Sequence, residues 1–204
     1  AAVAPTVLVS KDWQFDGWDK DFTCVNADMT VKANYLWDFV IANGRLTKYR
    51  GPGGAIAIPD GVTSIEDSVF SGLSTLKSVT IPDTVTSIGE KAFMQTAKLT
   101  SVGTSSENKI ATIGSSAFLF SGITMFDGSA LTTIGDMAFG GAVNLEKMPL
   151  SSSLKTIGDY AFSSCLKFNS SIPSSVTSIG QEAFASCAAL SRDLTLGEST
   201  GSLK

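Results

Sequence analysis

The stretch Ile-Gly-Glu-Lys-Ala-Phe, from Ile88 to Phe93, decides the fold because close copies of it return along the chain. A divergent first copy, from Ile65 to Phe70, lacks the glycine and the alanine. The Ile-to-Phe gap is five residues in every copy, whereas successive isoleucines are 23, 25, 21, 23 and 22 residues apart. A fixed gap within a period of this length indicates a stacked repeat. The copies begin at Ile65, Ile88, Ile113, Ile134, Ile157 and Ile179.

Each repeat also carries an apolar pattern upstream of its isoleucine, such as Leu76-x-x-Val79-x-Ile81. The alternation predicts a short strand with one inward face, and Pro82 is expected to end it. The segment from Gly89 to Met94 is expected to form one short α or 3₁₀ turn. Stacking should therefore give a parallel sheet, a column of isoleucines and a buried column of phenylalanines. The expected phenylalanines are Phe70, Phe93, Phe118, Phe139, Phe162 and Phe184.

The composition of the 204 residues excludes several functions. The chain is 43% hydrophobic, has a formal net charge of −4 and contains no histidine. A histidine base, a histidine–zinc site and a Ser-His-Asp triad are therefore excluded. The acidic balance argues against nucleic-acid binding, and no apolar run is long enough for a membrane span. We expect a non-catalytic protein without a metal or cofactor.

The pattern Ile-Pro-x-x-Val-Thr-Ser-Ile-Gly-x-x-Ala-Phe-x-x-Cys-x-x-Leu, at Ile172–Leu190, resembles the BspA-like leucine-rich repeats of bacterial surface proteins. The resemblance covers roughly residues 56–196. It implies a right-handed leucine-rich-repeat superhelix, β-rich with short helical turns and a parallel β-sheet. Residues 56–204 would form six coils and a partial seventh.

Two N-terminal segments precede the expected solenoid. In residues 36–55, apolar positions flank Asn43-Gly44, which is a favoured two-residue hairpin turn. We expect a β-hairpin cap over the first coil, followed by a joint at Gly51–Gly54. Residues 1–35 resemble part of a Listeria–Bacteroides repeat, a small β-rich module. The chain is expected to be a piece of a longer protein, or its C-terminal end is expected to meet another surface.

The candidate partner-binding residues lie around the irregular step of 25 followed by 21 residues. The assumed register turns Thr124 and Phe126 outward, and the extra length falls in the polar loop 103–109, which contains Ser105, Glu107 and Asn108. Phe120 replaces a small residue of the other repeats. An exposed aromatic side chain beside a variable loop favours a protein-binding hot spot. The alternative is that Phe120 and Phe126 fill space inside the irregular coil, and a register shift of one residue would turn Phe126 inward.

Cysteines and acidic residues offer weaker candidate sites. Cys165 and Cys187 occupy equivalent repeat positions, where they form either a disulfide between coils or two buried free thiols. Cys24 makes the cysteine count odd. The group Asp16, Asp19 and Asp21 lacks the spacing of a calcium loop, so solvated acids are the favoured interpretation.

The resemblance implies a protein-binding or adhesion module of a secreted or cell-surface bacterial protein. Its expected partner is a host or microbial extracellular protein, bound by a monomer. The alternative is a passive spacer that holds another domain away from the cell surface. A carbohydrate-active enzyme is a third reading, which would require two carboxylates about 5–10 Å apart in a cleft.

Overall fold

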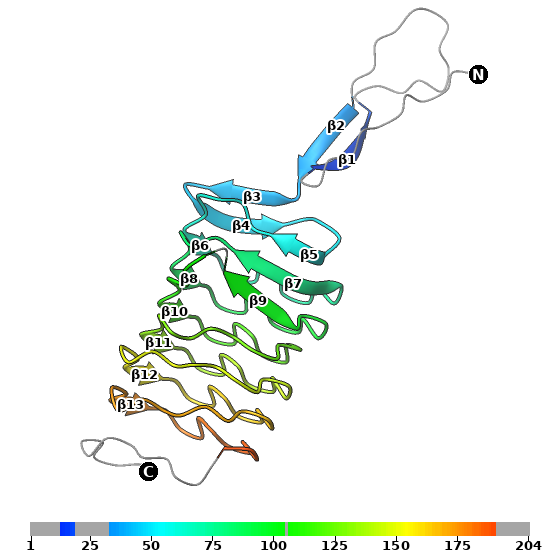
Figure 1. The fold of residues 1–204 in the computed structure, drawn as a ribbon. Coiled ribbons are helices and arrows are strands. Elements are labelled where there is room, and N and C mark those ends of the chain that lie inside the picture. The colour runs from blue at the N-terminus through cyan, green and yellow to red at the C-terminus, as the bar shows by residue number, and fades with distance from the viewer. Residues whose placement is uncertain (1–12, 19–32, 105, 191–204) are drawn as a thin grey trace, which may run out of the picture.

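The computed structural model describes residues 13–18, 33–104 and 106–190, with side chains from Asp38 onward. Six coils follow one another below a hairpin, and β1 and β2 form a separate antiparallel sheet beyond it (Figure 1). Coils 1 to 6 are named here by their repeat phenylalanines, Phe70, Phe93, Phe118, Phe139, Phe162 and Phe184. The strands are β1 Trp13–Trp18, β2 Ala33–Trp37, β3 Phe39–Ala42, β4 Arg45–Tyr49, β5 Gly54–Ala57, β6 Ser64–Ile65, β7 Leu76–Ile81, β8 Ser87–Ile88, β9 Ser101–Thr104, β10 Thr112–Ile113, β11 Thr133–Ile134, β12 Thr156–Ile157 and β13 Ser178–Ile179.

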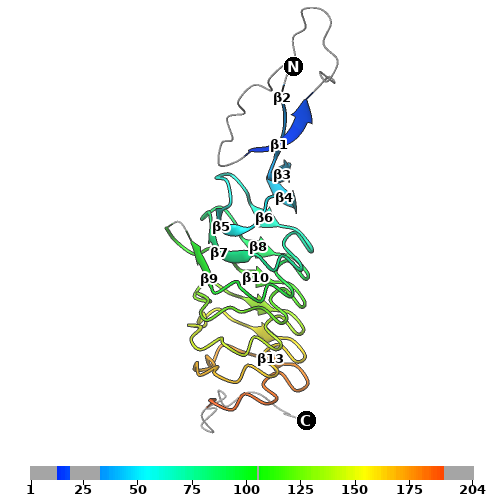
Figure 2. The ribbon, with the colours of Figure 1, turned by 90° about the vertical axis from the view of Figure 1, so that its right-hand side faces the viewer.

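Two sheets run along different sides of the stack (Figures 1 and 2). One is the expected sheet of β5, β7 and β9, which are parallel and in the predicted inward-outward alternation. The other has eight strands, and six of them are the Ser/Thr-Ile pairs that open each repeat motif. The predicted isoleucine column is confirmed, because each isoleucine pairs in register with its counterpart in the next coil.

The expectation of short helical turns is wrong. The segment after each isoleucine is a run of non-helical turns, and no helix of the described residues is long and apolar enough to cross a membrane. We call these segments together the Phe-turn face: residues 66–72, 89–95, 114–120, 135–141, 158–164 and 180–186.

Left-handed backbone explains why these segments are not helical. In each coil the third residue after the isoleucine and the second after the phenylalanine have positive φ, such as Lys91 at 55° and Gln95 at 58°. A left-handed residue interrupts a right-handed helix. The chain is instead flattened, so that alternate N–H groups point to the next coil. The amides of Lys91, Phe93 and Gln95 donate to carbonyl oxygens of coil 3 at 2.7–2.9 Å.

The phenylalanine column is confirmed as the centre of the core. Five of its rings are fully buried and Phe184 is half-buried. Neighbouring rings lie 4.9–5.3 Å apart between centroids, with interplanar angles of 2–12°. The spacing is close to the distance of about 4.7–4.9 Å between hydrogen-bonded strands, so the backbone ladder sets the ring stack. Tyr49 continues the column into the cap, 5.2 Å from Phe70.

The predicted hairpin cap is also confirmed. β3 and β4 pair antiparallel across Asn43-Gly44, whose φ values are 51° and 75°, as a two-residue hairpin turn requires. β4 then pairs parallel with β6 of the first coil and places Leu46 beside Ile65. Both side chains are buried, so the hairpin covers the apolar end of the solenoid.

The repeated glycine after each isoleucine is required by close packing between coils. A Cβ atom built on Gly135 would lie 2.8 Å from the backbone nitrogen of Ser115, and the equivalent glycines meet the preceding coil at 2.3–2.8 Å. Coil 1 has Glu66 at this position, where its neighbour is the hairpin cap. Glu66 forms an ion pair with Arg45 of β4. The missing glycine of the first repeat therefore marks the capped end.

Cys165 and Cys187 are free thiols in the structure, as one of the two alternatives predicted. The Sγ–H of Cys165 donates to the Phe139 carbonyl oxygen at 3.0 Å, and that of Cys187 to the Phe162 carbonyl oxygen at 3.1 Å. Burial raises the pKa of Cys165 to about 12 and that of Cys187 to about 11. Cys24 lies outside the described residues.

Replacing Phe139 by Ala should lower the free energy of unfolding by about 3–5 kcal/mol, because the change empties the middle of the ring column. The matched control is Phe120→Ala, which removes an exposed ring of the adjacent coil and should cost less than about 1 kcal/mol. Urea denaturation followed by circular dichroism measures both. Equal losses would contradict the buried column.

Replacing Gly135 by Ala should lower the free energy of unfolding by about 1–3 kcal/mol, because its methyl group would overlap the backbone of coil 3. Gly103→Ala is the control, since a Cβ atom there meets nothing within 4 Å. The thermal unfolding midpoints of the two variants are compared with that of the unchanged chain. If the Gly103 variant is as unstable as the Gly135 variant, the close-packing explanation is refuted.

In a Cys24→Ser variant, Cys165 and Cys187 should not react with a thiol reagent at pH 8 while the chain is folded. Their raised pKa values leave little thiolate, about a hundredfold less than for an ordinary thiol in the case of Cys187. Both should react at once in urea. A spectrophotometric thiol assay that finds no free thiol in urea would show a disulfide instead.

Candidate functional site

Phe126 does not face solvent, so its predicted place in an exposed hot spot is wrong. Its side chain is 3% exposed and lies between two rings of the column. The centroid distances are 5.5 Å to Phe118 and 5.8 Å to Phe139. Of the two alternatives for Phe126, local packing inside the irregular coil is the correct one.

A one-residue deletion in coil 3 explains the error in register. Ile123 follows Phe118 by five residues, whereas Leu99 follows Phe93 by six. The shortened corner is possible because of Gly122, where a Cβ atom would lie 2.1 Å from the Ala97 carbonyl oxygen. The parallel bridges of Met125 to Ser101 and to Lys147 show that Met125 takes the outward position, and it is 58% exposed.

Thr124 and the polar loop make contacts that stabilise the fold. The Thr124 hydroxyl is exposed and donates to the Thr100 carbonyl oxygen at 3.0 Å. Asn108 donates from its amide to the Asp127 carbonyl oxygen and accepts from the Ile110 amide at 2.9 Å. Glu107 is exposed and lies 3.8 Å from the Lys109 ammonium group. Ser105 lies outside the described residues.

Phe120 is exposed, at 57%, so internal packing does not explain this residue. It ends the Phe-turn segment of coil 3, before the chain reaches the Thr124–Phe126 strand position. The loop 103–109 follows the strand position of coil 2, at the opposite corner of the coil. The fold therefore separates Phe120 from the polar loop 103–109, so the two lie at different places on the coil.

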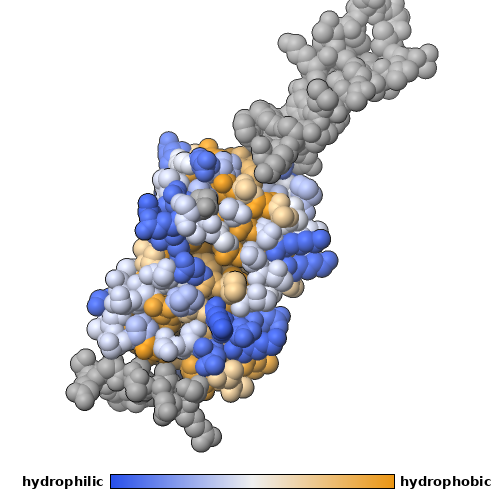
Figure 3. All heavy atoms as spheres, in the orientation of Figure 1, coloured by the Kyte–Doolittle hydropathy of each residue, from blue (hydrophilic) through white to orange (hydrophobic). Residues whose placement is uncertain are grey.

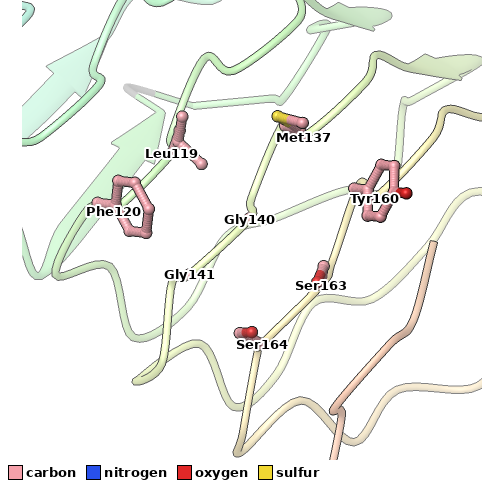
Figure 4. A pocket seen from close by; sticks show the side chains of 8 residues that line it. All are labelled: Leu119, Phe120, Met137, Gly140, Gly141, Tyr160, Ser163 and Ser164. Atoms are coloured by element: carbon pink, nitrogen blue, oxygen red, sulfur yellow. The ribbon is translucent and has the colours of Figure 1, made fainter. Parts of the chain in front are cut away.

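Phe120 instead forms one wall of a shallow apolar pocket on the Phe-turn face of coils 3 to 5 (Figure 4). The pocket has a volume of about 160 Å³. Phe120 and Leu119 lie on one side of it, and Tyr160, Ser163 and Ser164 on the other, with Gly140 and Gly141 between (Figure 4). Met137 lines it at one end and is 42% exposed.

The floor of the pocket consists of backbone because two glycines follow Phe139. A Cβ atom on Gly141 would lie 2.4 Å from the Phe120 ring, and one on Gly140 would lie 3.0 Å from Leu119. Gly141 also has a φ of 65°, which favours glycine. The pair therefore keeps the hollow open and lets the Phe120 ring lie over coil 4.

The bulky wall residues occupy left-handed positions where large side chains are unusual. Phe120, Met137 and Tyr160 have φ values of 53–56°. The remaining left-handed positions of the six Phe-turn segments hold Ser68, Gly72, Lys91, Gln95, Ser116, Gly141, Ser164, Glu182 and Ser186. Stacking therefore requires left-handed backbone at these positions but no particular side chain. The large apolar side chains in three adjacent coils are not needed for the fold.

A second hollow, of about 310 Å³, lies over coils 4 to 6. It is lined by Glu146, Lys147, Leu166, Lys167, Asn169 and Ala189. On the side seen in Figure 3, hydrophilic residues lie between the apolar areas. Among the described residues no group of three His, Cys, Asp or Glu side chains could hold a metal ion. The acidic group Asp16, Asp19 and Asp21 lies outside the described side chains.

The aspartates of the Phe-turn face connect neighbouring coils although they are at the surface. Asp136 is exposed, but its Oδ1 accepts from the Asp159 amide at 2.9 Å. Asp159 accepts in the same way from the Gln181 amide at 2.7 Å, and Asp67 from the Glu90 amide at 2.8 Å. Each carboxylate therefore links its coil to the next while keeping its charge at the surface.

Two similar solved structures are of bacterial proteins. The chain is 27% identical to a leucine rich cell surface protein of Faecalibacterium prausnitzii A2-165, with 94% of this chain and 55% of that one covered and a TM-score of 0.64. A leucine-rich repeat protein of Bacteroides ovatus is 26% identical, with 90% and 39% covered and a TM-score of 0.47. The chain thus spans about half the length of the Faecalibacterium protein. No curated protein matches it.

The repeats themselves match a family model described as BspA type Leucine rich repeat region, in six copies. The matches cover residues 54–169 and 112–203, which together are well over half of the chain. Together with the stacked coils and the repeated Ile-Gly-x-x-Ala-Phe motif, this match shows that the chain belongs to the BspA type leucine rich repeat family.

Proposed function

We propose that the chain is a non-catalytic binding module of a secreted or cell-surface bacterial protein, and that it engages an extracellular protein of a host or another microbe. The observation that carries the proposal is the set of exposed large apolar side chains on coils 3 and 4, two of which, Phe120 and Met137, line the same pocket. The set consists of Phe120, Met125, Met137 and Val143. Their positions hold smaller or polar residues in most other coils. Exposed apolar and aromatic clusters are typical of protein-binding surfaces.

The scaffold supports this role because the residues that hold the coils together are not the residues that face outward. Stacking uses the isoleucine and phenylalanine columns and the backbone ladders, all of which lie inside or between coils. Outward positions are then free to vary without loss of the fold. The surface location is supported by the description of the Faecalibacterium relative as a cell surface protein. Repeat proteins of this family and fold are typically non-catalytic.

A direct binding experiment distinguishes this proposal from the passive spacer. The purified chain is immobilised, and its association with extracellular-matrix proteins is measured by bio-layer interferometry. The control surface carries an unrelated solenoid of the same number of coils. We expect saturable binding of at least one matrix protein to the chain and none to the control. If the chain retains none of them, and bacteria carrying the control solenoid in its place attach to host cells equally well, the spacer reading replaces this proposal.

A further inference from the structure

The pocket beside Phe120 is of the size of one side chain. Its volume is about 160 Å³, and its walls are mostly the apolar surfaces of Leu119, Phe120, Met137 and Tyr160. An apolar cavity of about 150 Å³ in a protein accepts a benzene molecule. One aromatic ring or branched aliphatic group of a partner would therefore fill it, and the Phe120 face would cover that group from the side.

The charge around the pocket differs from that on the first two coils. In coils 1 and 2, Glu66 is paired with Arg45, and Glu90 with Lys91. In coils 4 to 6 the Phe-turn face carries Asp136, Asp159 and Glu182, and no lysine or arginine of its own. Within residues 38–104 and 106–190, no cation lies within 4.0 Å of these three carboxylates.

These acids stand next to the pocket walls. Asp136 precedes Met137 and Asp159 precedes Tyr160, while Glu182 has the position of Tyr160 in the next coil. All three carboxylates belong to exposed residues, and those of Asp136 and Asp159 are held in place by backbone amides. A row of unpaired negative charge favours a cationic partner and repels an anionic one.

We propose that the pocket of coils 3 to 5 binds a basic segment of a partner protein, with one apolar side chain of that segment inserted between Phe120 and Tyr160. The inference rests on the proposed binding function and names the chemistry of the partner. An anionic polysaccharide or an anionic lipid surface would meet the carboxylates and is disfavoured. The hydroxyls of Ser163 and Ser164 line the pocket and can donate to the carbonyl groups of an extended segment.

The probe is the capped peptide Lys-Lys-Phe-Lys-Lys, titrated into the isotopically labelled chain and followed by nuclear magnetic resonance. We expect shifts at the amides of Gly140, Gly141, Ser163 and Ser164. Exchange of the central phenylalanine for alanine should weaken binding about tenfold or more, as the loss of a buried ring predicts. A peptide with glutamates in place of the lysines should not bind. Binding should weaken as salt is added.

Two pairs of variants test the two parts of the site. Phe120→Ala should abolish the shifts, whereas Gln95→Ala, at the equivalent left-handed position of coil 2, should leave them unchanged. The double change Asp136→Asn and Asp159→Asn keeps the oxygen that accepts the backbone hydrogen bond and removes the charge. It should weaken binding at least fivefold and reduce the salt dependence. Asp67→Asn makes the same change away from the pocket and should have no effect.

Several results would overturn the proposal. They are equal binding of the lysine and glutamate peptides, shifts located elsewhere, no shifts at millimolar peptide, or a dimer of the chain that Phe120→Ala dissociates. If a matrix protein binds the chain and the Phe120 variant equally well, the proposed function stands and the pocket assignment fails. If the peptide binds as expected but no matrix protein is retained, the pocket assignment stands and the proposed function fails.

Discussion

The close approach of successive coils after each isoleucine is the constraint on which the rest of the structure depends. Each glycine amide there donates to the isoleucine carbonyl oxygen of the preceding coil at 2.8–2.9 Å, and a side chain would not fit in the gap. This contact fixes the spacing of the coils, and the spacing then stacks the phenylalanine rings at 4.9–5.3 Å. The left-handed residues of the turns also hold neighbouring coils together, because they direct alternate amides toward the next coil.

The interior of the fold could be predicted from the sequence because it repeats. The isoleucine and phenylalanine columns and the Asn43-Gly44 hairpin lie where their spacing and residue types predict. The turns could not be predicted, since an Ala-Phe pair after glycine is compatible with a helix as well as with left-handed backbone. The second sheet was missed for a related reason: each coil contributes only a two-residue strand, which has no periodicity of its own.

The candidate site was predictable only in part, because it depends on where coil 3 is shortened. The sequence shows a step of 21 residues, but the place of the deletion decides whether Phe126 or Met125 turns outward. Gly122 was the available signal, as a residue that permits a tight corner. The pocket itself joins residues of three repeats, and Tyr160 and Met137 stand at positions that look like variable surface in a single copy. Only the stacking register brings them beside Phe120.

The hydrogen bonds between coils determine how the stack bears a pulling force. On the Phe-turn side the amides of coils 1 to 5 donate toward the C-terminal neighbour, and on the isoleucine side the glycine amides donate toward the N-terminal neighbour. All of these bonds lie between coils. A force that pulls the two ends of the stack apart therefore passes through every interface in series, and each interface bears the same load. The weakest interface between two coils thus sets the strength of the solenoid under tension.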